Sequence, residues 1–155
     1  MVPKAEVIHE WDGVLKRLVD VSFDPREAVI IEEELPGKEW FEGSEGALKW
    51  SVDDISYGAN TVGIDVSLDG YGFLVVSDAY FPGWVAEVDG ERARIYRGDG
   101  AFRAIPLEPG EHRVEMRYEG RWFKAGLGIS ALSALALAVI LVTLMAVKWK
   151  RGKLV

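Results

Sequence analysis

Cysteine is absent from the 155 residues, and histidine occurs only twice. Without cysteine the chain has no disulfide bond, no thiolate nucleophile and no thiolate metal site, although disulfide-free domains occur on both sides of membranes. Acidic residues are also absent from residues 121–155, which carry six Lys and Arg side chains. Residues 1–120 carry 12 basic and 25 acidic residues, a balance of −13. A domain with this charge repels phosphate backbones, so we expect no nucleic-acid partner.

Charge of either sign is absent from the 23 residues between Lys124 and Lys148. As a helix this apolar run is roughly 35 Å long, which is enough to cross a bilayer. The run excludes a freely soluble enzyme, since it would expose a large apolar surface to water. We therefore predict a β domain at 1–120, a transmembrane helix with an interfacial flank at 121–148, and a short basic tail at 149–155.

Turn dipeptides recur at intervals close to ten residues along the second half of the domain, which is the spacing of an antiparallel β fold. They are Asp69-Gly70, Pro82-Gly83, Asp89-Gly90, Asp99-Gly100 and Pro109-Gly110. The segments around them are strand-like, and we predict strands at 48–55, 61–68, 72–77, 84–88, 93–96, 102–105 and 112–118. In the last of these strands one face carries Val114, Met116 and Tyr118. We therefore expect that face to be buried and the other to be exposed to solvent.

The first third of the chain indicates one helix and one strand. Apolar residues at helical spacing predict a short amphipathic helix within 11–20, and residues 27–33 predict a strand that is apolar on both faces. The stretch 34–46 mixes glycine, proline and charge, which is typical of an exposed loop. The predicted fold class is mainly β: an antiparallel, jelly-roll-like β-sandwich with one short amphipathic helix, followed by a single C-terminal transmembrane α-helix.

Basic residues are concentrated after the apolar run, and this asymmetry marks the cytoplasmic side of a membrane helix. They are Lys148, Lys150, Arg151 and Lys153, against only Arg121 and Lys124 on the other flank. Aromatic residues typical of membrane interfaces stand at both ends, namely Trp122, Phe123 and Trp149. We predict a single-pass protein of the cell membrane, with the β domain outside and the carboxyl terminus in the cytoplasm.

This orientation requires the domain to cross the membrane, yet the amino terminus lacks the apolar core of about 7 to 15 residues that a secretory signal has. Two alternatives follow. Either the chain is the last piece of a larger multi-span protein, or it is a tail-anchored protein whose domain is a cytoplasmic protein-interaction module. The distribution of basic residues favours the first alternative.

Small residues spaced four apart form one stripe along the predicted membrane helix, and they are Gly126, Ser130, Ala134 and Ala138. Such a stripe lets a second helix approach closely. The alternative is that alanine is simply frequent in this segment. The partners we predict are the lipid bilayer and the transmembrane helices of a multi-span protein or subunit.

Three aromatic residues surround the Pro82-Gly83 bend and could stack against a sugar ring: Tyr80, Phe81 and Trp84. The competing role is structural, because Pro82 fixes φ, Gly83 permits a bend and Trp84 can enter the core. We keep the aromatic platform as the candidate ligand-binding site beside this structural alternative.

Catalysis requires titratable groups that converge, and few candidates exist in this chain. They are His9, His112, the pair Asp53-Asp54 and the run Glu32-Glu33-Glu34. His112 opens a strand beside a turn, where we expect a hydrogen bond to a neighbouring loop. In a regular strand Asp53 and Asp54 point to opposite faces, so they do not form a dyad. We predict no catalytic residue, no metal site and no cofactor.

The run from Tyr71 to Ser130 contains distinctive motifs in a fixed order. They are Phe81-Pro82-Gly83-Trp84, Val88-Asp89-Gly90, Arg103-Ala104-Ile105-Pro106-Leu107, Gly110-Glu111-His112, and Tyr118 ahead of Trp122-Phe123. In order and spacing they resemble the carboxyl-terminal end of the YfhO family of multi-span membrane proteins. Residues 2–5 and 23–32 also resemble the start of that family's last extracytoplasmic region.

The resemblance implies a GT-C-type, glycosyltransferase-like protein that uses lipid-linked sugars and acts on cell-envelope glycopolymers or glycolipids. In such proteins the catalytic carboxylate lies in an early extracytoplasmic loop, which these 155 residues do not contain. We therefore expect a non-catalytic extracytoplasmic module and membrane anchor, with carbohydrate or a polyprenyl-linked sugar as its ligand. Met1 directly before the domain leads us to expect a split-gene subunit or a fragment.

Overall fold

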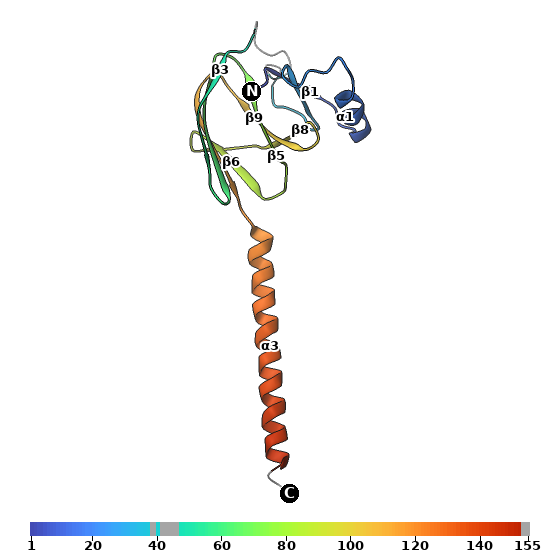
Figure 1. Cartoon of the computed structure of the whole chain (residues 1–155), viewed down its shortest axis with the longest axis vertical. Helices are drawn as coiled ribbons and strands as arrows, with labels where there is room; N and C mark the ends of the chain where they lie inside the picture. The colour runs from blue at the N-terminus through green and yellow to red at the C-terminus, as the bar shows by residue number, and fades with distance from the viewer. Residues whose placement is uncertain (38–39, 41–46, 153–155) are drawn as a thin grey trace. The chain divides into compact units, whose positions relative to one another are not determined.

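The computed structural model describes residues 1–37, 40 and 47–152, and side chains within that range except 121, 122, 124 and 146–152 (Figure 1). The chain divides into two compact units, residues 1–119 and 120–155, which we treat separately. The elements are β1 (Lys4–Val7), α1 (Trp11–Leu18), β2 (Ala28–Ile31), β3 (Trp50–Tyr57), β4 (Thr61–Leu68), β5 (Gly72–Ala79), β6 (Trp84–Val88), β7 (Glu91–Ala93), β8 (Tyr96–Gly98), β9 (Phe102–Leu107), β10 (Gly110–Tyr118) and α3 (Arg121–Gly152).

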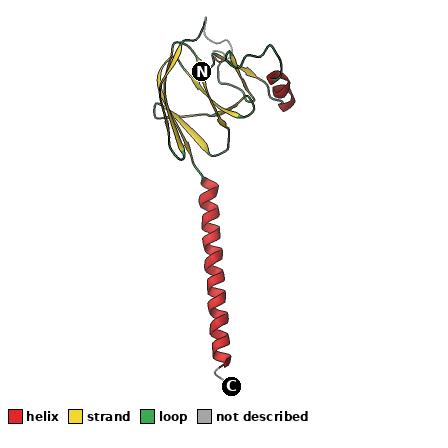
Figure 2. Cartoon of the chain, in the orientation of Figure 1, coloured by secondary structure: helices red, strands yellow, loops and turns green. Residues whose placement is uncertain are grey.

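Two five-stranded sheets pack together in the first unit and confirm the predicted β-sandwich (Figure 2). Sheet A has the strand order β1-β2-β8-β9-β5, and sheet B has the order β3-β4-β10-β6-β7. Most neighbouring strands are antiparallel, as expected. The exception is the parallel pair β1 and β2, because α1 crosses over between them and returns the chain in the same direction.

The main core lies between the two sheets and follows from period-two alternation in the strands. In β4 every second residue from Val62 to Leu68 is apolar and buried, and Val114 and Met116 continue this pattern on β10. The buried residues of this core are Val62, Ile64, Val66, Leu68, Leu74, Val76, Ala86, Ile105, Leu107, Val114 and Met116. Each large side chain buried in this way stabilises the fold by about 1.5 to 3 kcal/mol.

A second apolar cluster covers the other face of sheet A. Its buried residues are Val2, Ala5, Val29, Ile31, Leu35, Trp40, Phe73, Tyr96 and Ala104. The ring of Trp40 lies edge-on to Tyr71 and Phe73, with centroid distances of 5.1 and 5.6 Å. The predicted exposed loop at 34–46 is therefore wrong at Leu35 and Trp40, which sheet A buries. The rest of that prediction, at 38–39 and 41–46, lies outside the described residues.

The chain changes sheets where we predicted one strand at 93–96. β7 pairs with β6 in sheet B, whereas β8 pairs with β9 in sheet A. Residues 94 and 95 carry the chain across, so the predicted strand is wrong. The turns predicted at Asp89-Gly90 and Asp99-Gly100 are confirmed, because φ is positive at Asp89 (54°), Gly90 (85°), Asp99 (50°) and Gly100 (71°).

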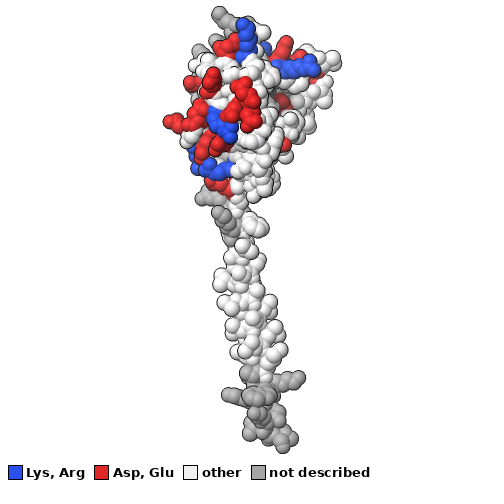
Figure 3. Space-filling view, turned by 60° about the vertical axis from the view of Figure 1, so that its left-hand side comes forward, with Lys and Arg blue, Asp and Glu red and all other residues white. Residues whose placement is uncertain are grey.

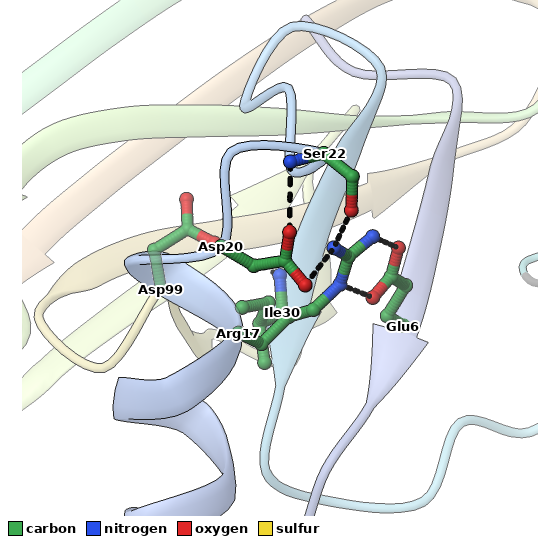
Figure 4. Close-up of polar contacts among 6 residues, drawn as sticks. All are labelled: Glu6, Arg17, Asp20, Ser22, Ile30 and Asp99. Carbon is green, nitrogen blue, oxygen red and sulfur yellow. Dashed lines mark hydrogen bonds and ion pairs between the residues drawn. The ribbon is translucent and has the colours of Figure 1, made fainter.

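Helix α1 is held on sheet A by an ion pair and by a tight turn. The Arg17 guanidinium donates to both carboxylate oxygens of Glu6 on β1, at 2.7 and 2.9 Å (Figure 4). This pairing lowers the pKa of Glu6. At the other side, a Cβ on Gly100 would lie 2.7 Å from the Trp11 ring, so only glycine lets the helix approach this turn. Asp99 in the same turn accepts a hydrogen bond from the Ile30 amide, at 2.9 Å.

The second unit contains the predicted apolar helix, α3. Its residues Ala125–Met145 are long and apolar enough to cross a membrane, and none of the window is buried. Figure 3 shows acidic and basic side chains gathered on the β domain, whereas none of the described side chains of α3, at 123 and 125–145, is charged. The predicted interface residues Trp122 and Trp149 and the basic residues from 148 onward lie outside the described side chains.

Replacing Phe73 by Ala tests the second cluster. Phe73 is fully buried, and we expect the free energy of unfolding to fall by about 3 to 5 kcal/mol, because its ring leaves a cavity. Denaturant unfolding of the full chain in detergent, followed by circular dichroism, measures the change. Val21→Ala is the control, since Val21 is fully exposed and its loss changes stability little. Equal effects of both substitutions would contradict the cluster.

Candidate functional site

The bend between β5 and β6 carries the predicted aromatic platform, and main-chain hydrogen bonds fix its shape. The Tyr80 amide donates to Ala101 O at 2.7 Å, and the Glu119 amide donates to Gly83 O at 2.7 Å. Gly83 has φ of +109°, and a Cβ there would lie 2.8 Å from the ring of Tyr118. Glycine is therefore required at Gly83 for both its backbone conformation and its close approach to Tyr118.

The three platform residues do not share one set of contacts. Trp84 stands opposite Tyr118 across β6 and β10, with ring centroids 5.9 Å apart. Phe81 is 6.4 Å from the same Tyr118 ring and 60% exposed. Tyr80 is half-buried under the Arg97 guanidinium, 5.6 Å from its ring centroid. Phe81 is thus the ring of the three that is open to a ligand, and the platform as a whole stays a prediction.

A buried arginine lies beneath Trp84, and the sequence analysis missed it. Arg103 on β9 is only 3% exposed, and its Cζ lies 4.0 Å from the Trp84 ring centroid. Its Nη2 donates to Asp78 Oδ2 at 2.8 Å, and its Nε has no hydrogen-bond partner in the described part of the chain. Alternation could have found it, because Arg103 shares a strand face with the buried Ile105 and Leu107.

The Arg103 contact joins the two sheets, since Trp84 belongs to sheet B and Arg103 to sheet A. A guanidinium over an indole ring, shielded from water, is worth about 2 kcal/mol. Asp78 is about half exposed, so it neutralises the cation while remaining hydrated. The contact packs one face of Trp84 against the interior. This agrees with the alternative in which Trp84 belongs to the core of the domain.

The titratable residues that could serve catalysis are held in structural contacts. His112 Nδ1 lies 2.7 Å from Asp89 Oδ2, and its Nε2 lies 2.9 Å from the carbonyl oxygen of Glu108. Each ring nitrogen of His112 therefore has an acceptor within hydrogen-bonding distance. The expected hydrogen bond from His112 to a neighbouring loop is confirmed. His9 likewise contacts Glu32 O at 3.0 Å and Glu34 Oε1 at 3.1 Å.

The acidic pair on β3 is separated by a β-bulge rather than by regular strand geometry. Asp54 pairs with Asp65, and the register shifts between Val52 and Asp54, so Asp53 is the extra residue. The Oδ1 of Asp53 accepts a hydrogen bond from Ser51 Oγ at 3.0 Å. Over the described residues, no group of three or more His, Asp or Glu side chains could hold a metal ion.

The small-residue stripe on α3 is open along its described length. Gly126, Ser130, Ala134 and Ala138 are all exposed. A Cβ on Gly126 would meet no described atom within 4 Å. Its role in packing against another helix stays a prediction.

The fold defines a class: a charged β-sandwich domain followed by one candidate membrane-spanning helix. A model of the family described as bacterial membrane protein YfhO matches residues 46–130, which is more than half of the chain. The chain belongs to the YfhO family of bacterial membrane proteins. The matched segment runs from before β3 into the first ten residues of α3. No curated protein and no solved structure matches the chain.

A pair of variants tests the buried cation. Asp78→Ala leaves the guanidinium of Arg103 without its carboxylate, and we expect a loss of about 3 kcal/mol in the free energy of unfolding. Adding Arg103→Met removes the buried charge, so the double variant is expected to be more stable than Asp78→Ala alone. Denaturant unfolding of the full chain gives both values. A double variant as unstable as the single one, or less stable, would show that the charge is not the cause.

The Asp89 contacts predict a pH dependence of stability. The Arg113 amide and the His112 ring hold the pKa of Asp89 below its usual value of 3.8. A lowered carboxylate pKa stabilises the fold above pH 3.8, and this contribution disappears as the pH falls through the folded-state pKa. We expect Asp89→Asn to lower Tm at pH 6 and to flatten the fall of Tm between pH 5 and pH 3. Glu91→Gln, on the exposed β7, is the matched control and should keep the wild-type slope.

Proposed function

We propose that the chain is a non-catalytic extracytoplasmic module and membrane anchor of a glycosyltransferase-type assembly acting on cell-envelope glycopolymers or glycolipids. One observation carries the proposal: the family match runs without a break from β3 through β10 into α3. The domain and the apolar helix are therefore parts of one family unit. The glycosyltransferase character comes from the resemblance of the 81–123 motifs to the end of YfhO proteins.

The contacts of the titratable residues support a module without catalysis of its own. The His112 ring lies 2.7 Å from the Asp89 carboxylate, which also accepts a hydrogen bond from the Arg113 amide at 2.8 Å. Asp99 is engaged with the Ile30 amide, and burial raises its pKa. These groups hold turns and strand ends together, which is a structural use of their charge and hydrogen-bonding capacity.

Orientation follows from the flanking charges of α3. Four basic residues follow the apolar run and two precede it, and this asymmetry supports an orientation with the carboxyl terminus in the cytoplasm and the β domain outside. The strongly acidic balance of the domain agrees with this side of the membrane, since the anionic cytoplasmic leaflet repels it.

A single introduced cysteine tests this orientation, because the natural chain has none. Glu91→Cys lies on the exposed strand β7, and we expect it to react in intact cells with a thiol reagent that cannot cross membranes. Lys153→Cys, at the other end, should react only after lysis. The reverse pattern would place the domain in the cytoplasm, as in the tail-anchored alternative.

The ligand that fits the proposal is a carbohydrate or a polyprenyl-linked sugar. Phe81 supports this class, because its ring is largely exposed while Tyr118 fixes it from one side. Sugar rings stack on exposed aromatic faces held in this way. In the same proposal α3 packs against transmembrane helices of a multi-span partner.

Bulky substitutions on the small-residue stripe test this packing. We expect Gly126→Leu and Ser130→Leu to weaken association with multi-span YfhO-family proteins, because leucine prevents close contact of two helix backbones. Leu132→Ile and Leu137→Ile, which leave the stripe unchanged, are the controls. Co-purification in mild detergent measures the association. Equal recovery of all four variants and the wild type would mean that the helix serves only as an anchor.

A further inference from the structure

Strand β3 carries an apolar row that the sandwich does not cover. It is the edge strand of sheet B and pairs with β4 (Figure 1). The row consists of Trp50, Val52, Ile55 and Tyr57, which are 49, 37, 50 and 70% exposed. Their partners across the strand pair are Leu68, Val66, Ile64 and Val62, all buried in the main core. Directly opposite residues in a strand pair lie on the same face of the sheet. The row therefore continues the core-facing side of sheet B past the area that sheet A covers.

The β-bulge at Asp53 keeps this row on one face. Apolar residues at 50, 52, 55 and 57 have an odd gap of three in the middle, so a regular strand would turn Ile55 and Tyr57 outward. The extra residue between Val52 and Asp54 absorbs the gap, and Ile55 then faces Ile64. Because of the β-bulge at Asp53, the four apolar side chains of β3 lie on one face of the strand.

The free edge of β3 also offers main-chain hydrogen-bonding groups beside the same residues. The Gly58 amide donates to Thr61 O at 2.8 Å at one end of the pair, and the Asp69 amide donates to Lys49 O at 3.1 Å at the other. Hydrogen-bonded and non-hydrogen-bonded pairs alternate in an antiparallel ladder. Counting from these ends, Trp50, Ile55 and Tyr57 occupy non-hydrogen-bonded positions. Their backbone N–H and C=O groups therefore point away from β4, toward the open edge.

Charge at this edge selects among possible occupants. Asp53 and Asp54 lie in the middle of the strand, and the only charged residue within one position of its ends in the sequence is Lys49. A second copy pairing through β3 would bring like carboxylates together, which is destabilising. Asp53 and Asp54 therefore disfavour pairing of two β3 strands and favour a partner segment that carries basic side chains.

We propose that the edge of β3 is a docking site for an extended segment of a partner protein, which adds a strand to sheet B. Main-chain hydrogen bonds form along the open edge, alternate apolar side chains of the segment cover the Trp50 to Tyr57 row, and its Lys or Arg side chains face Asp53 and Asp54. This inference rests on the strand geometry and is independent of the proposed function.

A peptide titration on the full chain in phosphatidylcholine nanodiscs tests the proposal. The probe is a fluorescent nine-residue peptide in which valine alternates with lysine and threonine, and fluorescence anisotropy measures its binding. We expect saturable binding. The same peptide with N-methylated amides on its pairing edge should not bind, and replacing its lysines by glutamates should also abolish binding.

Variants of β3 locate the binding. Val52→Thr with Ile55→Thr, and separately Asp53→Lys with Asp54→Lys, should weaken the affinity at least about tenfold. These side chains are exposed, so the variants are expected to fold, and circular dichroism melting verifies it. Ser56→Thr, on the opposite strand face, is the control with unchanged affinity.

Three results would overturn the proposal. The first is no saturable binding of the lysine peptide by the wild-type chain. The second is equal binding to the N-methylated peptide or to empty nanodiscs, which would mean adsorption to lipid. The third is a concentration-dependent dimer of the wild type that Ile55→Thr abolishes in sedimentation, since a second copy would then cover the row.

Discussion

The burial of one apolar interior between two sheets is the constraint on which the β domain depends. β4 and β10 supply one side of this interior, and β5 and β9 supply the other. Because side chains alternate along a strand, the same residues that build the interior oblige their neighbours to face water. Those neighbours form ion pairs such as Arg113 with Asp65 and Arg117 with Glu87, at 2.6 and 2.7 Å. Exposed pairs of this kind add little stability, so the interior carries the fold.

Arg103 is the exception inside that interior, and its surroundings explain how a cation is tolerated there. The Trp84 face and the Asp78 carboxylate replace part of the water that the guanidinium loses. One consequence is geometric. The cation connects sheet A to the first residue of β6, and Tyr118 packs on the same indole, so the bend at Phe81 is positioned from both sheets. The aromatic residues there are organised by the core and not by the surface loop alone.

The separation of charge along the chain connects the fold to the proposed function. Acidic residues are confined to the β domain and are absent from residues 121–155, where the apolar helix lies. Among the described residues, the edge strand β3 carries an apolar row that continues past the cover of sheet A. The proposals above assign the exposed stripe of α3 and the exposed edge of β3 to contacts with other proteins.

Periodicity and composition in the sequence determined the sandwich, the Asp-Gly turns, the alternation of β10 and the apolar helix, because each depends on local spacing. Tertiary structure alone decided which sheet each strand joins, since pairing partners are distant in sequence: β8 meets β2 and β9, and β1 meets β2 in parallel. It also buried Leu35 and Trp40 in a segment that reads as a loop. The sequence shows the platform residues, and the alternation of β9 puts Arg103 on the same face as Ile105 and Leu107, although an arginine in a strand ordinarily faces water. Only packing of the two sheets removes that water and leaves Arg103 inside.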